Sequence, residues 1–361
     1  MDDVRVAAVA DEIVTQKPPP PVRFYNRWQD LLEDNDIDIV SIATPPNTHA
    51  QIACGALKAG KNVLIEKPIA TNIEDGRSIV ELCSKTGQIA TVDYMLRFNP
   101  IVEALGALSR EKVFGELRHV NVENYAQDQG LPLEHWFWDR RISGGILIEH
   151  AVHFIDFVHS LTSQRYRAVE GLGHNRNDRQ EDQVLACVLY EAGLIATHYH
   201  SFARPGFFED TSIRLNYDLA QIDIRGWIPL SGRLAALLNS ETKDRLCQLP
   251  GLKIGQATSV QDLEDVSRPK GWGNTEPQPD HHSRAKVRSG GVEYNVEEMI
   301  VATFDVGKPK HEVYTSCVQA ILGDLIAACE NRTHRLRVTI EDGLSSLEIA
   351  HLATQSAYAH N

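Results

Sequence analysis

Short, continuous apolar runs alternate with amphipathic segments along the first hundred residues. The runs that predict strands are residues 4–10, 37–43, 62–65 and 89–94. Because these runs are continuous and not alternating, they indicate strands buried on both faces of a parallel sheet. The segments that predict helices are residues 26–35, with Asn26 as N-cap, 49–59 and 73–86. This alternation predicts an α/β domain.

One connection departs from that pattern. A crossover helix is expected between Asp11 and Phe24, but the segment contains four consecutive prolines at positions 18–21. Proline removes a backbone donor and clashes with the preceding turn, so a helix cannot continue through them. We expect a short or irregular connection, with a polyproline stretch as one possibility.

The pattern changes after about residue 125. Predicted strands occupy residues 117–124, 183–190, 194–202, 212–217 and 220–225. The Glu191-Ala192-Gly193 turn joins two of them as a hairpin, which favours a mostly antiparallel sheet in an α+β domain. Residues 250–291 are rich in Gly, Pro, Ser and charge and predict a long loop. Helical periodicity returns at residues 312–329 and 341–358.

Two motifs with candidate chemistry follow predicted strands of the first domain. Ala43-Thr44-Pro45-Pro46-Asn47-Thr48-His49 forms a turn that opens into a helix, and Glu66-Lys67-Pro68 follows the next strand. Ligands of parallel sheets bind beyond the carboxyl ends of the strands. The first motif fits phosphate or ribose binding, and a lysine in the second could polarise a substrate hydroxyl. A plain turn and a surface lysine are the alternatives.

A third motif, Ser143-Gly144-Gly145 followed by a helical pattern, carries an acid and a base. Glu149, His153 and Asp156 are spaced to share one helix face. Histidine is the most common general base for a hydroxyl proton, although a buried core histidine is as plausible here. His150, His198 and His200 lack the spacing of a zinc site, so we expect no metal.

An aromatic segment, His135-Trp136-Phe137-Trp138-Asp139, precedes the glycine pair. Its rings, Trp138 among them, fit either stacking on a sugar or nicotinamide, or a domain interface, and the sequence leaves both open.

Composition bounds the remaining possibilities. The 361 residues suffice for two domains, and the six cysteines are scattered without metal-ligand spacing. The net charge of −13 argues against nucleic acid as a partner. Neither a leader at the start nor an apolar run of about 20 residues is apparent, so we expect a cytoplasmic protein that does not bind membranes.

Together these motifs resemble the glucose–fructose oxidoreductase/inositol dehydrogenase-like (Gfo/Idh/MocA) family. The resemblance follows the order of the segments IATPPNTHA, AGKNVLIEKPIA, YMLRFNP, VFGELRHV, SGGILIEHAVHFID and EDGLSSLEIAHLATQSAY. It implies a Rossmann-like dinucleotide-binding domain over residues 1–97, an α+β sheet domain that carries the substrate over 98–340, and a C-terminal helix over 341–361.

The resemblance also implies residue roles. Lys67 would be the active-site lysine and His153 the general base, with Glu149 in place of the family's usual aspartate. The cofactor, NAD or NADP, would be held by Asp11, Thr44, Pro45, Asn47, His49, Glu66, Lys67, Arg97 and Trp138. A sugar, sugar acid or cyclitol is the implied substrate, and a homo-oligomer the implied assembly.

One feature departs from the family. Relatives begin with a strand and a glycine-rich loop, whereas this chain has no glycine before Gly55, so the dinucleotide domain is expected to be incomplete at its N-terminus. Three functions stay open: a dehydrogenase, a redox-neutral lyase, epimerase or glycosidase that borrows the same hydride, and a noncatalytic sugar- or NAD-sensing regulator.

Overall fold

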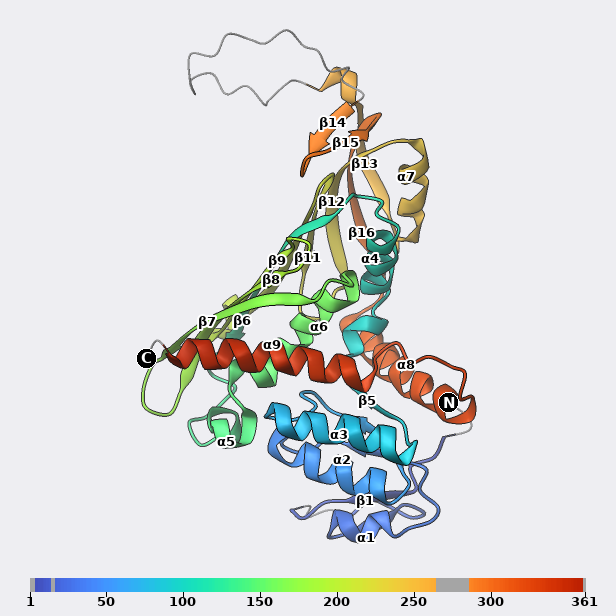
Figure 1. Cartoon of the computed structure of the whole chain (residues 1–361), viewed down its shortest axis with the longest axis vertical. Helices are drawn as coiled ribbons and strands as arrows, with labels where there is room; N and C mark the ends of the chain where they lie inside the picture. The colour runs from blue at the N-terminus through green and yellow to red at the C-terminus, as the bar shows by residue number, and fades with distance from the viewer. Residues whose placement is uncertain (1–3, 14–16, 264–285, 360–361) are drawn as a thin grey trace.

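The computed structural model describes residues 4–13, 17–263 and 286–359. The described chain has two regions (Figure 1): a layered α/β region built from the N-terminal third, and a broad twisted sheet with helices against one face. The combination of a Rossmann-type region with a large, mostly antiparallel sheet confirms the predicted fold class.

The strands of the first region are all parallel and form two separate sheets. In one, β1 (Ala8–Ala10) pairs with β2 (Arg23–Tyr25). In the other, the order is β3 (Ile39–Ile42), β4 (Asn62–Ile65), β5 (Ala90–Val92). Among the described residues, no strand joins β1 to β3. The sequence predicted β1 too long and missed β2, which has only three residues.

Three helices accompany these strands, and their bounds are α1 (Trp28–Leu32), α2 (His49–Lys58) and α3 (Ile73–Thr86). The packing of α1 on α2 is close, since a Cβ on Gly55 would lie 2.7 Å from the Trp28 ring. The predicted N-cap of the first helix is wrong: Arg27 precedes α1 and its side chain makes no capping hydrogen bond. The described part of the proline segment is not helical, as expected.

The large sheet has nine strands in the order β13-β16-β12-β11-β10-β6-β9-β8-β7 among the described residues. Every neighbouring pair is antiparallel except β6 with β9. The strand bounds are β6 (Leu117–Gln127), β7 (Tyr166–Asn175), β8 (Glu181–Tyr190), β9 (Ile195–Arg204), β10 (Asp210–Tyr217), β11 (Ala220–Arg225), β12 (Ser231–Leu238), β13 (Lys253–Ser259) and β16 (Glu298–Asp305). A separate hairpin comprises β14 (Lys286–Ser289) and β15 (Val292–Asn295).

The predicted loop over residues 250–291 is partly wrong, because β14 of the hairpin and the edge strand β13 lie within it. This edge strand is almost wholly exposed and carries no apolar alternation, so the pattern gave no signal. Residues 264–285 of the same prediction lie outside the described part.

Helices cover one face of the large sheet. They include α4 (Pro100–Arg110), α6 (Val152–Leu161) and the long α9 (Ile340–Ala359). Helix α9 runs along β7 and also packs on α3, so it contacts both regions (Figure 1). The short α7 (Ser240–Arg245) lies near the end of the sheet far from α3.

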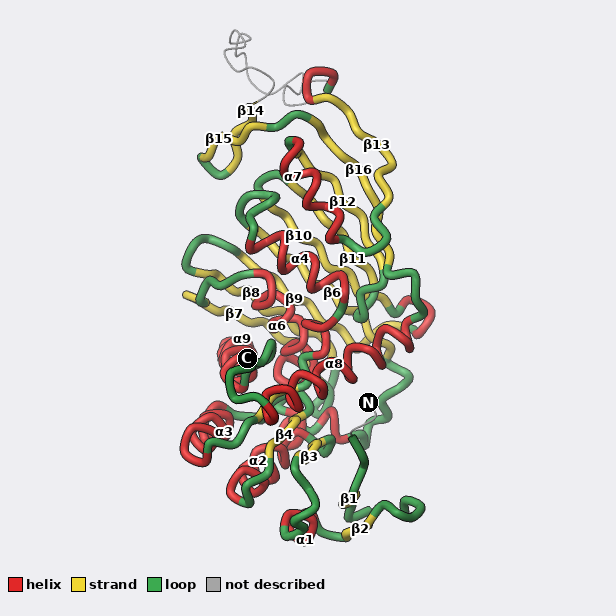
Figure 2. Tube along the Cα trace, turned by 90° about the vertical axis from the view of Figure 1, so that its right-hand side faces the viewer, coloured by secondary structure: helices red, strands yellow, loops and turns green. Residues whose placement is uncertain are grey.

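Helix α8 (Lys310–Glu330) packs against β4 and the short turn η2 (Met95–Phe98) (Figure 2). Its length and apolar composition would by themselves suit a membrane span, which the sequence reading did not anticipate. One side of it, with Val313, Cys317, Ile321 and Leu325, is buried against the fold. That burial is also what a core-packed helix shows.

Candidate active site

The candidate site lies where the carboxyl ends of β3, β4 and β5 face the start of α6. Strand β4 ends at Ile65, and its two successors, Glu66 and Lys67, extend beyond the sheet edge. The Lys67 ammonium donates to the Glu149 carboxylate at 2.5 Å and to the Glu149 backbone carbonyl at 2.7 Å. These contacts join the Rossmann-type region to the second region.

A π-helical turn, η4 (Leu147–Ala151), sets the position of Glu149 before α6 begins. The wider turn inserts one residue relative to an α-helix, a feature that concentrates at functional sites. The Glu149 carbonyl is directed to Lys67. Sequence spacing placed Glu149 and His153 one regular turn apart and could not foresee this insertion.

Two glycines and a buried carboxylate hold the start of this turn. Gly144 and Gly145 have φ of +83° and +95°, which side chains rarely tolerate. Glu181, on β8, accepts from the Ile146 backbone N–H at 3.0 Å and from Arg140 at 3.2 Å. Glu181 was not singled out from the sequence; an acidic residue starting a buried strand was the available signal.

In the candidate site, burial and neighbouring charges have opposite effects on the pKa of Glu149. Burial alone would raise the pKa of Glu149, but the Lys67 ammonium together with the nearby His150 and His135 more than offsets it, and the pKa is lowered. Glu149 is therefore held as a carboxylate paired with Lys67.

His153 stands beside this pair. Burial, reinforced by the charge of Lys67, puts the pKa of His153 well below its usual range, so the ring is neutral at neutral pH. Its Nδ1 is buried and has no hydrogen-bond partner among the described residues, and its ring meets Tyr94 edge-on, with centroids 6.1 Å apart. A neutral imidazole with an uncommitted nitrogen can accept a proton.

Asp93, the residue after β5, adds a second carboxyl group that the sequence analysis missed. It is 6% exposed, and its Oδ1 has no hydrogen-bond partner in the described part of the chain. Its neighbour on the adjacent strand is Glu66, which follows β4 in the same register. Burial and the Glu66 charge raise the pKa of Asp93 to about 7. A carboxylate at the end of a buried strand was the signal available.

His49 holds the turn after β3 in place from its buried side. Its Nδ1 lies 2.7 Å from the Pro68 carbonyl and its Nε2 lies 2.8 Å from the Thr44 carbonyl. The ring is buried and its polar atoms face the protein, so it orients the turn. Thr44, Pro45 and Asn47 stay exposed along the turn, where a ligand can reach them.

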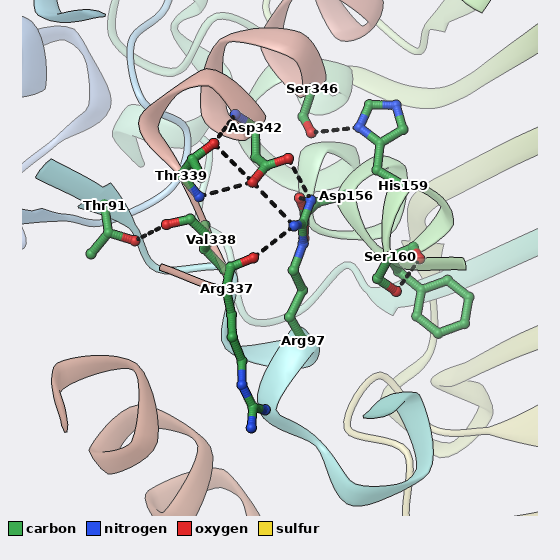
Figure 3. A network of polar contacts seen from close by, with 11 residues as sticks. Thr91, Arg97, Asp156, His159, Ser160, Arg337, Val338, Thr339, Asp342 and Ser346 are labelled. Atoms are coloured by element: carbon green, nitrogen blue, oxygen red, sulfur yellow. Dashed lines mark hydrogen bonds and ion pairs between the residues drawn. The ribbon is translucent and has the colours of Figure 1, made fainter. Parts of the chain in front are cut away.

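Two predicted cofactor residues are engaged elsewhere. Arg97 makes a bidentate pair with Asp156 at 2.7 and 2.9 Å and also contacts Asp342 (Figure 3). Trp138 is buried in η3 (Trp136–Trp138), where its indole N–H donates to the Leu131 and Pro132 carbonyls. Their assignment to the cofactor stays a prediction, and the structure gives both a packing role.

The remaining candidates are Asp11 and three buried histidines, of which His150 directly follows Glu149. Asp11 is exposed after β1, where its carboxylate accepts from the Ile13 backbone N–H. His150, His198 and His200 are buried among aromatic rings, with His150 and His200 centroids 5.3 Å apart. No group of three or more potential ligands suited to a metal ion occurs among the described residues.

Comparison with known proteins agrees with the fold. The model of an oxidoreductase family with an NAD-binding Rossmann fold, GFO_IDH_MocA, matches residues 5–94, and the GFO/IDH/MocA C-terminal domain matches residues 102–219. Among solved structures, levoglucosan dehydrogenase in complex with NADH and L-sorbose superposes with a TM-score of 0.68 at 18% identity, over 94% of this chain and 82% of that one. A putative myo-inositol dehydrogenase from Sinorhizobium meliloti 1021 gives 0.64 at 19% identity, over 100% and 92%.

Curated relatives match over shorter stretches. The scyllo-inositol 2-dehydrogenase (NAD(+)) of Bacillus subtilis is 30% identical over 45% of this chain and 48% of its own length. The levoglucosan dehydrogenase of Pseudarthrobacter phenanthrenivorans is 30% identical over 38% of this chain and 36% of its own length. The chain thus spans about half, or less, of the length of these relatives. With both domain models matched in order, the chain belongs to the Gfo/Idh/MocA family of oxidoreductases.

Proposed function

We propose that the protein is an NAD(P)-dependent oxidoreductase that interconverts a hydroxyl and a carbonyl on a sugar, sugar acid or cyclitol. The observation that carries this is the meeting of Lys67, Glu149 and the neutral His153 at the edge of a Rossmann-type sheet. A dehydrogenase needs a proton acceptor and an electrophile at one hydroxyl, and these residues supply both.

Each residue has a separate task. An ammonium has three donors, and two of those on Lys67 go to Glu149, which leaves one for the substrate oxygen. That donor stabilises alkoxide character as the C–H bond breaks. His153 takes the hydroxyl proton. Glu149 orients Lys67 and, through its second carboxylate oxygen, can accept from another substrate hydroxyl.

The residues at the carboxyl edge of the sheet fit a nicotinamide cofactor. Asp93 Oδ1, which has no hydrogen-bond partner among the described residues, and the exposed residues Thr44, Pro45 and Asn47 lie at this edge, where dinucleotides bind in parallel sheets. Glu66 and Lys67 would face the nicotinamide end, and Asp11 the ribose of the adenosine. When bound, this cofactor accepts or returns the hydride.

The substrate class is proposed from chemistry and from the relatives. One relative is named for scyllo-inositol and another for levoglucosan, both polyhydroxylated rings. A site that offers a lysine, a carboxylate and a histidine suits a substrate with several neighbouring hydroxyls. The domain limits at residues 97 and 340, a homo-oligomeric state and a cytoplasmic location remain predictions.

The test is a turnover screen of the purified chain with inositols, aldoses and anhydrosugars, scyllo-inositol and levoglucosan included, with NAD⁺ and NADP⁺ in parallel. With any substrate found, Lys67→Met should lower kcat by about 10²–10³-fold, because one preorganised electrophilic donor is lost. The matched control is Lys112→Met, which removes an exposed lysine from its Glu116 pair. Unchanged turnover in Lys67→Met would remove the assignment.

The same assay distinguishes two alternative functions. A redox-neutral lyase, epimerase or glycosidase would convert substrate without net release of NADH. A sensing regulator would bind sugar or NAD without turnover. The retained Lys67, Glu149 and His153 favour catalysis, since binding alone does not require an electrophile and a base at one point.

A further inference from the structure

We propose that Asp93 and Glu66 form a carboxyl pair which shares one proton and releases it when the oxidised, cationic nicotinamide binds. The proposal rests on the proposed function and deepens it: it assigns Asp93 as a residue that sets the preference between NAD⁺ and NADH.

The geometry begins with two neighbouring strand ends. Glu66 follows β4 and Asp93 follows β5, and the Asp93 backbone N–H donates to the Ile65 carbonyl at 2.7 Å. The register of the parallel pair therefore places the two carboxyl groups side by side. Two ionised carboxylates at neighbouring strand ends repel each other, which favours a proton on one of them.

The surroundings offer little compensation for a second negative charge. From η2, the Met95 backbone N–H contacts Asp93. From α8, Tyr314 and Cys317 face the pair, and burial with the nearby carboxylates raises the pKa of both side chains, so neither is charged near neutrality. Lys67 is the cation in range, and its ammonium is already engaged by Glu149. The pair thus keeps one proton at about neutral pH.

Hydride transfer fixes which part of the cofactor comes near. The reacting carbon would have to lie within reach of Lys67 and His153, so the nicotinamide ring would lie at this edge of the sheet. Asp93 Oδ1 is buried and unpartnered among the described residues, at the strand end next to Glu66 and Lys67. The carboxyl pair would therefore lie next to this end of the cofactor.

The charge balance then follows. The oxidised ring carries one positive charge and the reduced ring carries none. A cation beside the pair favours its doubly ionised form, so NAD⁺ binding releases one proton to solvent, whereas NADH binding does not. After hydride transfer the ring is neutral and the pair takes a proton back.

The experiment measures the Kd of NAD⁺ and of NADH for the full chain between about pH 6 and about pH 8, by calorimetry in two buffers of different ionisation enthalpy. In the wild type, the ratio of the NADH Kd to the NAD⁺ Kd should rise several-fold per pH unit, up to the tenfold limit of a single proton. NAD⁺ binding should release protons below about pH 7. In Asp93→Asn, which leaves one ionised carboxylate, the ratio should change less than about twofold over the range.

The control is Asp38→Asn, which removes an exposed carboxylate just before β3, at the opposite edge of the same sheet. This variant should keep the wild-type pH dependence. If Asp93→Asn does not fold, carboxyl ¹³C NMR of the wild type decides in its place: a shared proton requires a carboxyl resonance that titrates near neutrality.

The negative outcomes are distinct. Binding of both cofactors with a pH-independent ratio in the wild type, or a pH-dependent ratio retained in Asp93→Asn, overturns the shared proton and leaves the proposed function standing. Failure of the wild type to bind either cofactor overturns the proposed function, and this inference with it.

Discussion

Buried histidines make the stability of the second region sensitive to acid. His198 lies on β9 beneath the helices, and both of its ring nitrogens lack hydrogen-bond partners among the described residues. Burial lowers the pKa of His198 to about 3. Because an unfolded histidine binds a proton at about pH 6.5, the contribution of His198 to stability is complete above that pH and declines as the pH falls towards about 3.

Replacing this histidine tests that account. His198→Leu should stabilise the protein by about 1–3 kcal/mol at neutral pH, because an unsatisfied buried polar group is removed. It should also flatten the fall in the free energy of unfolding on acidification. Urea unfolding at about pH 7.5 and about pH 5.5 measures both effects. His311→Leu, at an exposed site on α8, should reproduce neither; a wild-type acid response in His198→Leu would contradict the account.

At the scale of single residues, the sequence predicted candidates where a chemically suitable side chain follows a predicted strand or lies on a predicted helix face. Residue type and spacing singled out Lys67, Glu149 and His153 as candidates; the structure pairs Lys67 with Glu149, and the charge of Lys67 acts on His153. Their roles stay predictions. Asp93 was missed because a lone carboxylate after a strand carries no motif. Its partner, Glu66, comes from the adjacent strand, and only strand pairing makes the two neighbours.

At the scale of elements, the contact between β7 and α9 depends on one glycine. A Cβ on Gly171 would overlap the backbone of α9 at Ala353, whereas a Cβ on Gly173, two residues along the same face, would have its nearest neighbour at 3.4 Å. Both sites are glycines on the same face of the same strand. They differ in the space available to a side chain.

We predict that Gly171→Ala destabilises the protein by about 1–3 kcal/mol, because α9 must shift away from the sheet. Gly173→Ala should change the free energy of unfolding by less than about 0.5 kcal/mol. Equilibrium urea unfolding of the two variants makes the comparison. Equal effects would show that strand propensity, and not helix docking, governs the position.

The predictions of helices and strands were correct for long periodic segments and wrong where tertiary packing determines the local structure. The helices at residues 73–86, 312–329 and 341–358 lie within a residue or two of α3, α8 and α9. Strands β7, β12 and β16 were missed although each pairs on at least one side in the large sheet. The π-helical turn at Leu147–Ala151 was also not predicted, since its tertiary contacts, from Lys67 to the Glu149 carbonyl and from the Ile146 N–H to Glu181, come from residues distant in the chain.

At the scale of the whole molecule, a buried ion-pair network ties three segments distant in the chain. Arg97 from η2 meets Asp156 from α6 and Asp342 from α9 (Figure 3). Burial raises the pKa of Asp156 to about 6 although Arg97 opposes the shift. Thr91 donates to the Val338 carbonyl beside it, so the connection between α8 and α9 is fixed on the Rossmann-type region.

Replacing Arg97 should show how much stability is lost when the Asp156 carboxylate is buried without a cation. Arg97→Met leaves the fully buried Asp156 unpaired and is expected to cost about 3–5 kcal/mol of stability. In the double variant Arg97→Met/Asp156→Asn the loss should be smaller, because no charge is left buried. Unfolding free energies of the two single variants and the double variant complete the cycle. Additive losses would mean that the pair contributes no coupling.

The separation of β1 and β2 from the other parallel strands has a consequence for how tightly a dinucleotide is held. Strands of three residues, paired only with one another, form a unit that opens locally at low cost. Salt bridges from Arg23 to Asp34 and Asp36 are among its few ties to the segment before β3. The predicted ribose ligand, Asp11, belongs to this unit, whereas Lys67 and Glu149 form a largely buried pair outside it. If Asp11 binds the adenosine ribose, ordering this unit would lower the affinity for a dinucleotide, and that affinity would depend on a conformational equilibrium as well as on contacts.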